Sequence, residues 1–177
     1  MIDSPESLLP LVDEEGNILG SLTRAEAHSG TNQLHPVVHL HVFNSQGQLY
    51  LQKRPEWKDI QPGKWDTAVG GHVDLGESVE QALRREVAEE IGITDYEPER
   101  LTQYVFESAR ERELVFVHKT IYDGTIAPDK DELADGRFWS KEEIAASMGK
   151  GIFTPNFENE YREVLMGKGS GAADTAS

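Results

Sequence analysis

Three glutamates with the chemistry of metal ligands, Glu86, Glu89 and Glu90, lie close together in the segment REVAEE. The apolar residues around them recur at helical spacing. At about 100° per residue, Glu86 and Glu90 fall inside the apolar arc and Glu89 lies at its edge. Turning unpaired carboxylates toward apolar neighbours is costly, so a positive partner is expected. The adjacent Arg85 can pair with one of the three but not with all of them. Clustered carboxylates that keep room for water suit Mg2+ or Mn2+, whereas the alternative is a solvated helix face.

The helix that must carry these glutamates has clear ends in the sequence. Ser78 is a good N-cap with Gln81 as its partner in a capping box, and Gly92 is a good C-terminal stop, so the predicted helix spans residues 78–91. A second helix is predicted at about 156–166. Apolar segments between turns predict strands at 8–13, 18–22, 35–44, 48–54, 101–107 and 114–122. The expected fold is α/β, a mixed β-sheet covered by helices on its faces.

The composition fits one globular domain, since the 177 residues are 37% hydrophobic and 28% charged. A net charge of -15 disfavours nucleic acid as a partner. Cysteine is absent, which excludes disulfides, thiolate nucleophiles and zinc-thiolate sites. The N-terminal sequence has no signal-peptide pattern and no long apolar run, so we expect a cytoplasmic protein without a membrane partner. Residues 167–177 are small and polar and are expected to be a disordered tail after a domain of residues 1–166.

The glutamate helix and the loop before it resemble a complete Nudix box over residues 71–93. The match runs from Gly71 through Glu77 to the segment REVAEEIGI, and every fixed position of the pattern is filled. Several defined positions at fixed spacing make this match far more specific than a lone glycine motif. The resemblance implies the Nudix fold, a mixed β-sheet sandwiched between α-helices. It also implies a pyrophosphatase-type hydrolase of nucleoside diphosphates that are linked to another moiety.

The same resemblance implies a role for each polar residue of the box. Divalent metal, Mg2+ or Mn2+, would be bound by the helix carboxylates and by a backbone carbonyl ahead of them: Glu86, Glu89, Glu90, and Gly70 or Gly71. One of the glutamates would also steer or deprotonate the attacking water, and Glu77 with Arg85 would form a salt bridge that orients the site. Cleavage of a diphosphate needs such metals to neutralise developing charge and to hold the reacting groups in line.

A second set of residues resembles the metal-binding set of isopentenyl diphosphate isomerase, an enzyme of the same fold. The set consists of three histidines and two glutamates at matching positions: His28, His35, His72, Glu111 and Glu113. Together they would suit Mn2+, Zn2+ or Mg2+, whereas each one alone has a simpler structural interpretation. The isomerases need a catalytic cysteine where this chain has Gly70, so a hydrolase of the isomerase-like branch is favoured over an isomerase. A ligand-sensing module that does no chemistry is a third hypothesis.

A basic patch within this acidic chain is the candidate phosphate-binding surface. Its cations fall in one short stretch: Lys53, Arg54, Lys58 and Lys64. Such a patch attracts an anionic small molecule, and the resemblance restricts the partner to a diphosphate-containing substrate. The family resemblance also implies that a homodimer is common, although no residue here indicates an interface.

Four further aromatic and imidazole side chains have open interpretations. Trp57 and Trp65, in the basic stretch, either stack on a ligand or anchor their loop. His39 and His41 share a strand face with His35 because strand side chains alternate with a period of two. We interpret these two histidines as sheet packing or pocket lining.

Overall fold

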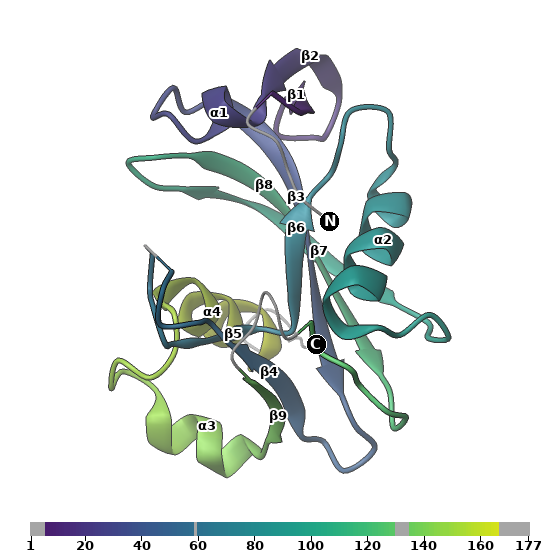
Figure 1. The fold of residues 1–177 in the computed structure, drawn as a ribbon, viewed down its shortest axis with the longest axis vertical. Coiled ribbons are helices and arrows are strands. Elements are labelled where there is room, and N and C mark those ends of the chain that lie inside the picture. The colour runs from purple at the N-terminus through teal and green to yellow at the C-terminus, as the bar shows by residue number, and fades with distance from the viewer. Residues whose placement is uncertain (1–5, 59, 130–134, 167–177) are drawn as a thin grey trace.

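The computed structural model describes residues 6–58, 60–129 and 135–166, which form a mixed β-sheet with helices on both faces (Figure 1). Across the sheet the strands are ordered β5 (Trp65–Thr67), β4 (Leu49–Lys53), β3 (Leu34–Phe43), β8 (Arg112–Ile121) and β7 (Glu99–Glu107). Two more strands join this path, β6 (Val69–His72) beside β3 and β9 (Asp135–Trp139) beside β4. Strands β3 and β8 are parallel and the other pairs are antiparallel, so the predicted mixed sheet of an α/β protein is confirmed.

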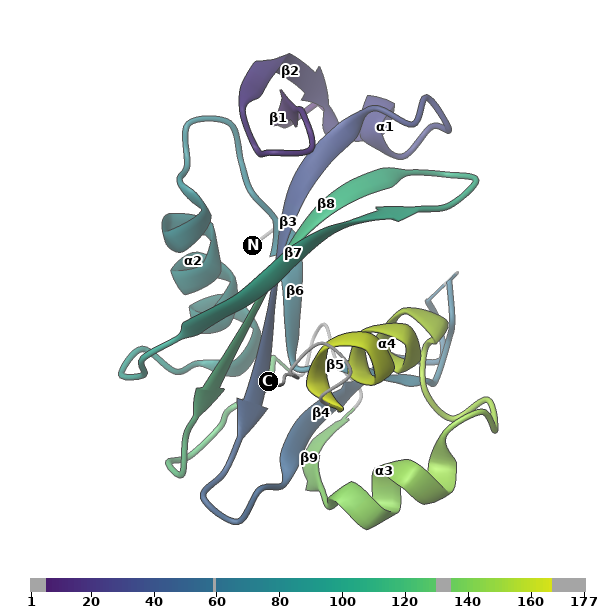
Figure 2. The same ribbon diagram turned by 180° about the vertical axis from the view of Figure 1, so that it is seen from behind.

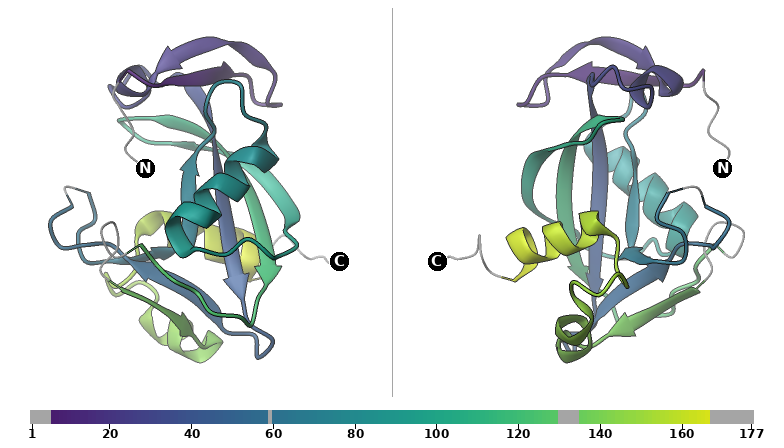
Figure 3. Two further views of the ribbon diagram at one scale, coloured as in Figure 1. Left: turned by 45° about the vertical axis from the view of Figure 1, so that its right-hand side comes forward. Right: turned by 90° about the vertical axis from the view of Figure 1, so that its left-hand side faces the viewer.

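Helix α2 (Val79–Ile91) covers one face of the sheet, and α4 (Pro155–Glu160) with the following π-helix η1 (Tyr161–Leu165) lies on the other (Figures 2 and 3). Strand β3 serves both faces because its successive side chains alternate. Val38 and Leu40 pack in the same core cluster as Val87 of α2. Val37 packs instead in a cluster that Val164 of η1 joins. The strand therefore has one row of side chains for each helix layer.

Three smaller elements complete the described part of the chain. The hairpin of β1 (Leu8–Val12) and β2 (Ile18–Thr23) forms a separate two-stranded sheet. This hairpin and the short helix α1 (Arg24–Ala27) lie at one end of the main sheet (Figure 1). Helix α3 (Lys141–Ser147) follows β9. Within the described residues, none of the helices has the length and apolar character that crossing a bilayer requires.

Most predicted elements are present, and the differences have physical causes. The helix predicted at about 156–166 is present, but it changes type along its length, because α-helical bonding ends at Glu160 and a π-helix follows, in which the Met166 N–H donates to the Tyr161 carbonyl at 2.9 Å. The sequence pattern also misses α1, α3, β5, β6 and β9, which are short, and β6 contains two adjacent glycines that disfavour a strand. The tail predicted at 167–177 lies outside the described residues.

Candidate active site

The predicted ends of helix α2 are confirmed. Ser78 Oγ accepts a hydrogen bond from the Gln81 N–H at 3.0 Å, and Gln81 Oε1 accepts one from the Ser78 N–H at 2.8 Å. Gly92 ends the helix with a φ of 69°, a left-handed conformation that suits glycine, and its N–H donates to the Val87 carbonyl. With both ends fixed, the helix turns Glu86 toward the sheet, where its exposed fraction is 8%.

Strand β6 meets α2 at a point where only glycine fits. Gly71 pairs with Val38 of β3, which lies in the core beneath α2. A Cβ atom added at Gly71 would lie 2.1 Å from Cδ of Glu86 and 2.3 and 2.5 Å from its two oxygens. The missing side chain therefore lets a carboxylate rest directly against the backbone of β6, which is the usual reason for glycine at a close approach.

Glu90 is held on the same side by a strand residue. Gln52 of β4 donates from Nε2 to Glu90 Oε1 at 3.1 Å and to the Ala68 carbonyl at 2.9 Å. Burial raises the pKa of Glu90 well above its usual value, and the neighbouring Glu86 raises it further. Burial also raises the pKa of Glu86, although Arg85 and Glu90 oppose that shift. Two carboxyl groups in mutual contact with raised pKa values form a site where a cation would be favourable.

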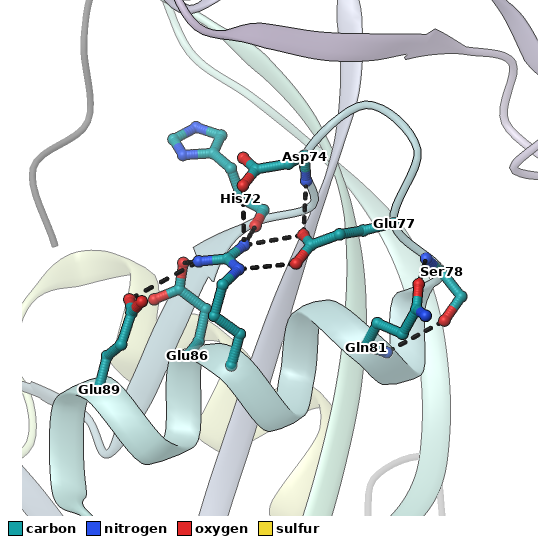
Figure 4. Close-up of polar contacts among 8 residues, drawn as sticks. His72, Asp74, Glu77, Ser78, Gln81, Glu86 and Glu89 are labelled. Atoms are coloured by element: carbon teal, nitrogen blue, oxygen red, sulfur yellow. Dashed lines mark hydrogen bonds and ion pairs between the residues drawn. The ribbon is translucent and has the colours of Figure 1, made fainter.

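Arg85 ties the loop before α2 to the helix by contacts with Glu77 and Glu86, which are labelled in Figure 4. Its Nε donates to Glu77 Oε2 at 2.7 Å and its Nη2 to Glu77 Oε1 at 2.9 Å, a bidentate pair that lowers the pKa of Glu77. Nη2 also donates to the His72 carbonyl at 3.0 Å. Nη1 donates to Glu86 at 2.9 Å and lies 3.7 Å from Glu89. The expectation that Arg85 pairs with one helix glutamate is therefore too narrow, because the fork of its guanidinium reaches two.

A cavity of about 320 Å3 brings the predicted carboxylates of helix α2 together with part of the predicted phosphate-binding stretch. Its lining includes the three helix glutamates, the glycines of β6 and two of the predicted cations: Glu86, Glu89, Glu90, Gly70, Gly71, Arg54 and Lys58. His72 lines the same cavity. The other two predicted phosphate-binding residues, Lys53 and Lys64, are not among the lining residues. Lys53 faces Trp65 in the pairing of β4 with β5, and the Lys64 carbonyl accepts a bond from the Arg54 N–H at 2.8 Å.

Several residues that line the cavity are not predicted from the sequence, and the sequence leaves the role of His39 open between two interpretations. The missed residues come from several parts of the chain: Arg24, Gln52, Asp66, Thr67 and Asp129. Gln52 carries one sequence signal, a polar amide within the apolar run of β4, which marks the residue as unusual but does not place it in the cavity. His39, for which sheet packing and pocket lining were both open, lines the cavity. The two tryptophans differ in their surroundings. Trp65 packs edge-on against Trp139, with ring centroids 5.2 Å apart, whereas Trp57 is 67% exposed.

The second predicted set forms a compact group beside the cavity. Single ligand atoms of four of its members lie within 4.8 Å of one another: His28, His35, His72 and Glu111. His28 Nε2 lies 3.2 Å from both His72 Nε2 and Glu111 Oε1. The fifth member, Glu113, approaches His35 Nε2 at 4.0 Å. Residues of β3, β6 and β8, the residue that follows α1 and the loop before β8 therefore converge on one point.

One nitrogen in this group has no hydrogen-bond partner among the described residues. His35 is fully buried, and its Nδ1 lies 3.1 Å from the Gln33 carbonyl, which fixes Nδ1 as the donor and leaves a lone pair on the unpartnered Nε2. Burial lowers the pKa of His35 and, well below its usual value, that of His72, so both favour the neutral form that binds metals. Burial and the adjacent Glu111 raise the pKa of Glu113 to about 8.

Both groups fit divalent cations by the chemistry of their donors. Carboxylate oxygens with open space beside them suit the hard ions Mg2+ and Mn2+, as the cavity next to Glu86, Glu89 and Glu90 provides. Imidazole nitrogens mixed with carboxylates suit Mn2+ or Zn2+, and the orphaned Nε2 of His35 is the atom that such an ion would satisfy.

Comparison with known proteins gives consistent matches. A family model described as the NUDIX domain matches residues 33–157. An uncharacterized Nudix hydrolase of Listeria monocytogenes is 35% identical over 149 residues, which are 83% of this chain and 88% of that protein. An isopentenyl-diphosphate Delta-isomerase of Mycolicibacterium vanbaalenii is 32% identical over 155 residues, 82% of this chain and 84% of that protein. The crystal structure of a Deinococcus radiodurans protein matches with a TM-score of 0.76 at 25% identity, over 89% of this chain and 98% of that one.

Proposed function

The chain belongs to the Nudix hydrolase family, and from this premise we propose that it is a Mg2+- or Mn2+-dependent enzyme that cleaves the diphosphate linkage of a small molecule by water attack. The substrate class is a nucleoside diphosphate derivative or a related diphosphate. We assign this activity to a domain of residues 1–166. The carrying observation is the carboxylate of Glu86 seated against Gly71, in the cavity that Glu89 and Glu90 share.

We propose that the metal ions bind to the carboxylates of Glu86, Glu89 and Glu90. A backbone oxygen of Gly70 or Gly71 would be a further ligand. When bound, the ions would neutralise the diphosphate and lower the pKa of water. The chain itself would hold and orient the reacting groups. Arg85, anchored by both oxygens of Glu77, would fix the position of the Glu86 carboxylate.

The chemical step uses few protein groups. Water attacks phosphorus, the bond to the bridging oxygen breaks, and Glu86 or Glu89 steers the water and accepts its proton. Arg54, at the cavity wall, supports the proposal as a cation for the phosphate. Lys53 and Lys64 would contribute to the positive field of the same loop rather than to direct contact.

We assign a second metal to the imidazole group of His28, His35 and His72 with the carboxylates of Glu111 and Glu113. The orphaned nitrogen of His35 and the shared proximity of the ligand atoms support this assignment. An isomerase of isoprenoid diphosphates is the second candidate function, because the same group is the one that resembles the isomerases. Gly70 weighs against it, since glycine supplies no thiol for proton transfer. The sensing module is disfavoured because binding alone has no need of three convergent carboxylates.

The deciding experiment incubates the protein with Mg2+ or Mn2+ and a panel of nucleoside and isoprenoid diphosphates. Release of phosphate or monophosphate and formation of allylic isomer are followed together. We expect release that depends on metal and that falls by at least about 100-fold in Glu86→Gln and in Glu90→Gln, because each removes a proposed ligand charge.

Glu80→Gln is the matched control, an exposed glutamate on the same helix that should leave the rate unchanged. Circular dichroism checks that each variant is folded. Full activity in both site variants would overturn the assignment, and isomer without release would favour the isomerase.

A further inference from the structure

A second buried carboxylate lies behind the cavity, outside the Nudix box. Glu160, the last residue of α4, is 1% exposed and receives three donors from the sheet. His39 Nδ1 lies 2.9 Å from Oε1, His41 Nε2 lies 2.5 Å from Oε2, and the Tyr104 hydroxyl also donates to Oε1. Among the described residues its ion-pair partners are these two histidines and include neither lysine nor arginine. A buried carboxylate held only by such donors needs imidazolium character in at least one of them.

Of these three donors, only His39 also reaches the cavity. His41 is fully buried, whereas the His39 side chain is 18% exposed and lines the cavity with Glu86, Glu89 and Glu90. Since Nδ1 of His39 faces Glu160, the opposite edge of the ring, Nε2 with Cδ2, is directed away from that carboxylate. Nε2 has no hydrogen-bond partner in the described part of the chain.

Gly70 gives this ring edge its opening. Strands β3 and β6 pair His39 with Gly70, so the two residues share a sheet face. A Cβ atom at Gly70 would lie 3.3 Å from Cδ2 and 3.5 Å from Nε2 of His39. The glycine therefore leaves the imidazole edge uncovered on the face opposite to the one where Gly71 meets Glu86. The cavity thus receives a carboxylate from one face of β6 and an imidazole from the other.

We propose that His39 is a further substrate-binding residue, whose Nε2–H donates a hydrogen bond to an anionic oxygen of the diphosphate group while Glu160 holds the ring in place. Burial alone would lower the pKa of His39, but the Glu160 carboxylate outweighs burial and raises it to about 9, which agrees with a donor at both nitrogens. This inference rests on the proposed diphosphate substrate. It adds a positioning residue, Glu160, from the helix layer opposite α2.

Calorimetric titration with methylenediphosphonate in the presence of Mg2+ tests the binding role without any turnover. We expect His39→Gln to bind this probe about 10- to 100-fold more weakly than the wild type, because a charge-assisted hydrogen bond is lost. In hydrolysis assays the same variant should raise KM by a similar factor with a smaller change in kcat. Glu160→Gln should show the same pattern in weaker form, because the ring remains present but is less firmly oriented.

Two matched variants control for structural damage. His118→Gln changes a buried histidine of β8 that lies with the α2 face, and Glu158→Gln changes a neighbouring carboxylate on α4. Neither should alter binding of the probe. In the wild-type protein, the 15N signal of His39 Nε2 should shift on saturation with the probe and that of His118 should not, which covers the case of a variant that does not fold.

The results separate this inference from the proposed function. Absence of hydrolysis with every diphosphate of the panel would overturn the proposed function, while the calorimetry and the 15N shift would still decide the role of His39. Equal binding by the wild type and His39→Gln, or no binding by the wild type, would overturn the inference alone.

Discussion

The contact between Gly71 and Glu86 makes a sharp prediction at the scale of single residues. Gly71→Ala would place a methyl group 2.1 Å from Cδ of Glu86, so the carboxylate must move out of its position. We expect the hydrolysis rate to fall by at least about 100-fold, as for loss of a precisely placed site group, while far-ultraviolet circular dichroism stays native. Gly20→Ala is the matched control, since its added methyl would meet only Leu11 Cδ2 at 3.9 Å. Equal activity of the two variants would show that the close approach has no functional role.

The sequence predicts some of these residues because their signals are local. The helical spacing alone turns Glu86 and Glu90 toward the core, and Glu86 is indeed buried. Gln52 and His39 could not be placed in the same way. They reach the cavity from β4 and β3, through pairings between segments far apart in the chain, which no periodicity in the sequence encodes.

At the scale of elements, α2 was predictable because its ends carry their own hydrogen-bonding groups, while the three- and four-residue strands β5 and β6 have too few residues to show a period.

The N-cap of α2 should contribute to the stability of the protein but not to its activity. We expect Ser78→Ala to lower the free energy of unfolding by about 1 kcal/mol, because the Gln81 N–H loses its acceptor. The turnover number should change little, since Glu86, Glu89 and Glu90 lie in the later turns of the helix.

Ser140→Ala provides the control for this prediction, because Ser140 forms the same capping box with Glu143 on α3. Urea denaturation should give similar losses for the two variants. A turnover loss of more than about 10-fold in Ser78→Ala alone, at equal stability, would show that the start of α2 takes part in the reaction.

At the scale of the whole molecule, the protein has a net charge of -15. Two carboxylate-containing groups also meet at β6, one in the cavity with Glu86, Glu89 and Glu90 and one with Glu111 and its histidines. Self-repulsion of this kind destabilises the metal-free protein and favours cation binding. The effect should be visible as a dependence of stability on pH, because the burial of Glu113 and its neighbour Glu111 raise the pKa of Glu113 from 4.5 to about 8 in the folded protein.

The sign of that dependence follows from proton linkage. The folded state binds the Glu113 proton more tightly than the unfolded state, so this contribution to stability is present below a pH of 4.5 and is lost as the pH rises through about 8.

Glu113→Gln cannot ionise at this position. In a chelator, its melting temperature should therefore rise above that of the wild type increasingly between about pH 5 and about pH 9. Glu99→Gln, at an exposed position of β7, should show no such trend. Added Mn2+ should stabilise the wild type more than Glu113→Gln and so reverse the difference, because the ion would replace the proton between the carboxylates. A difference in melting temperature that stays constant with pH would mean that ionisation of Glu113 does not destabilise the metal-free protein.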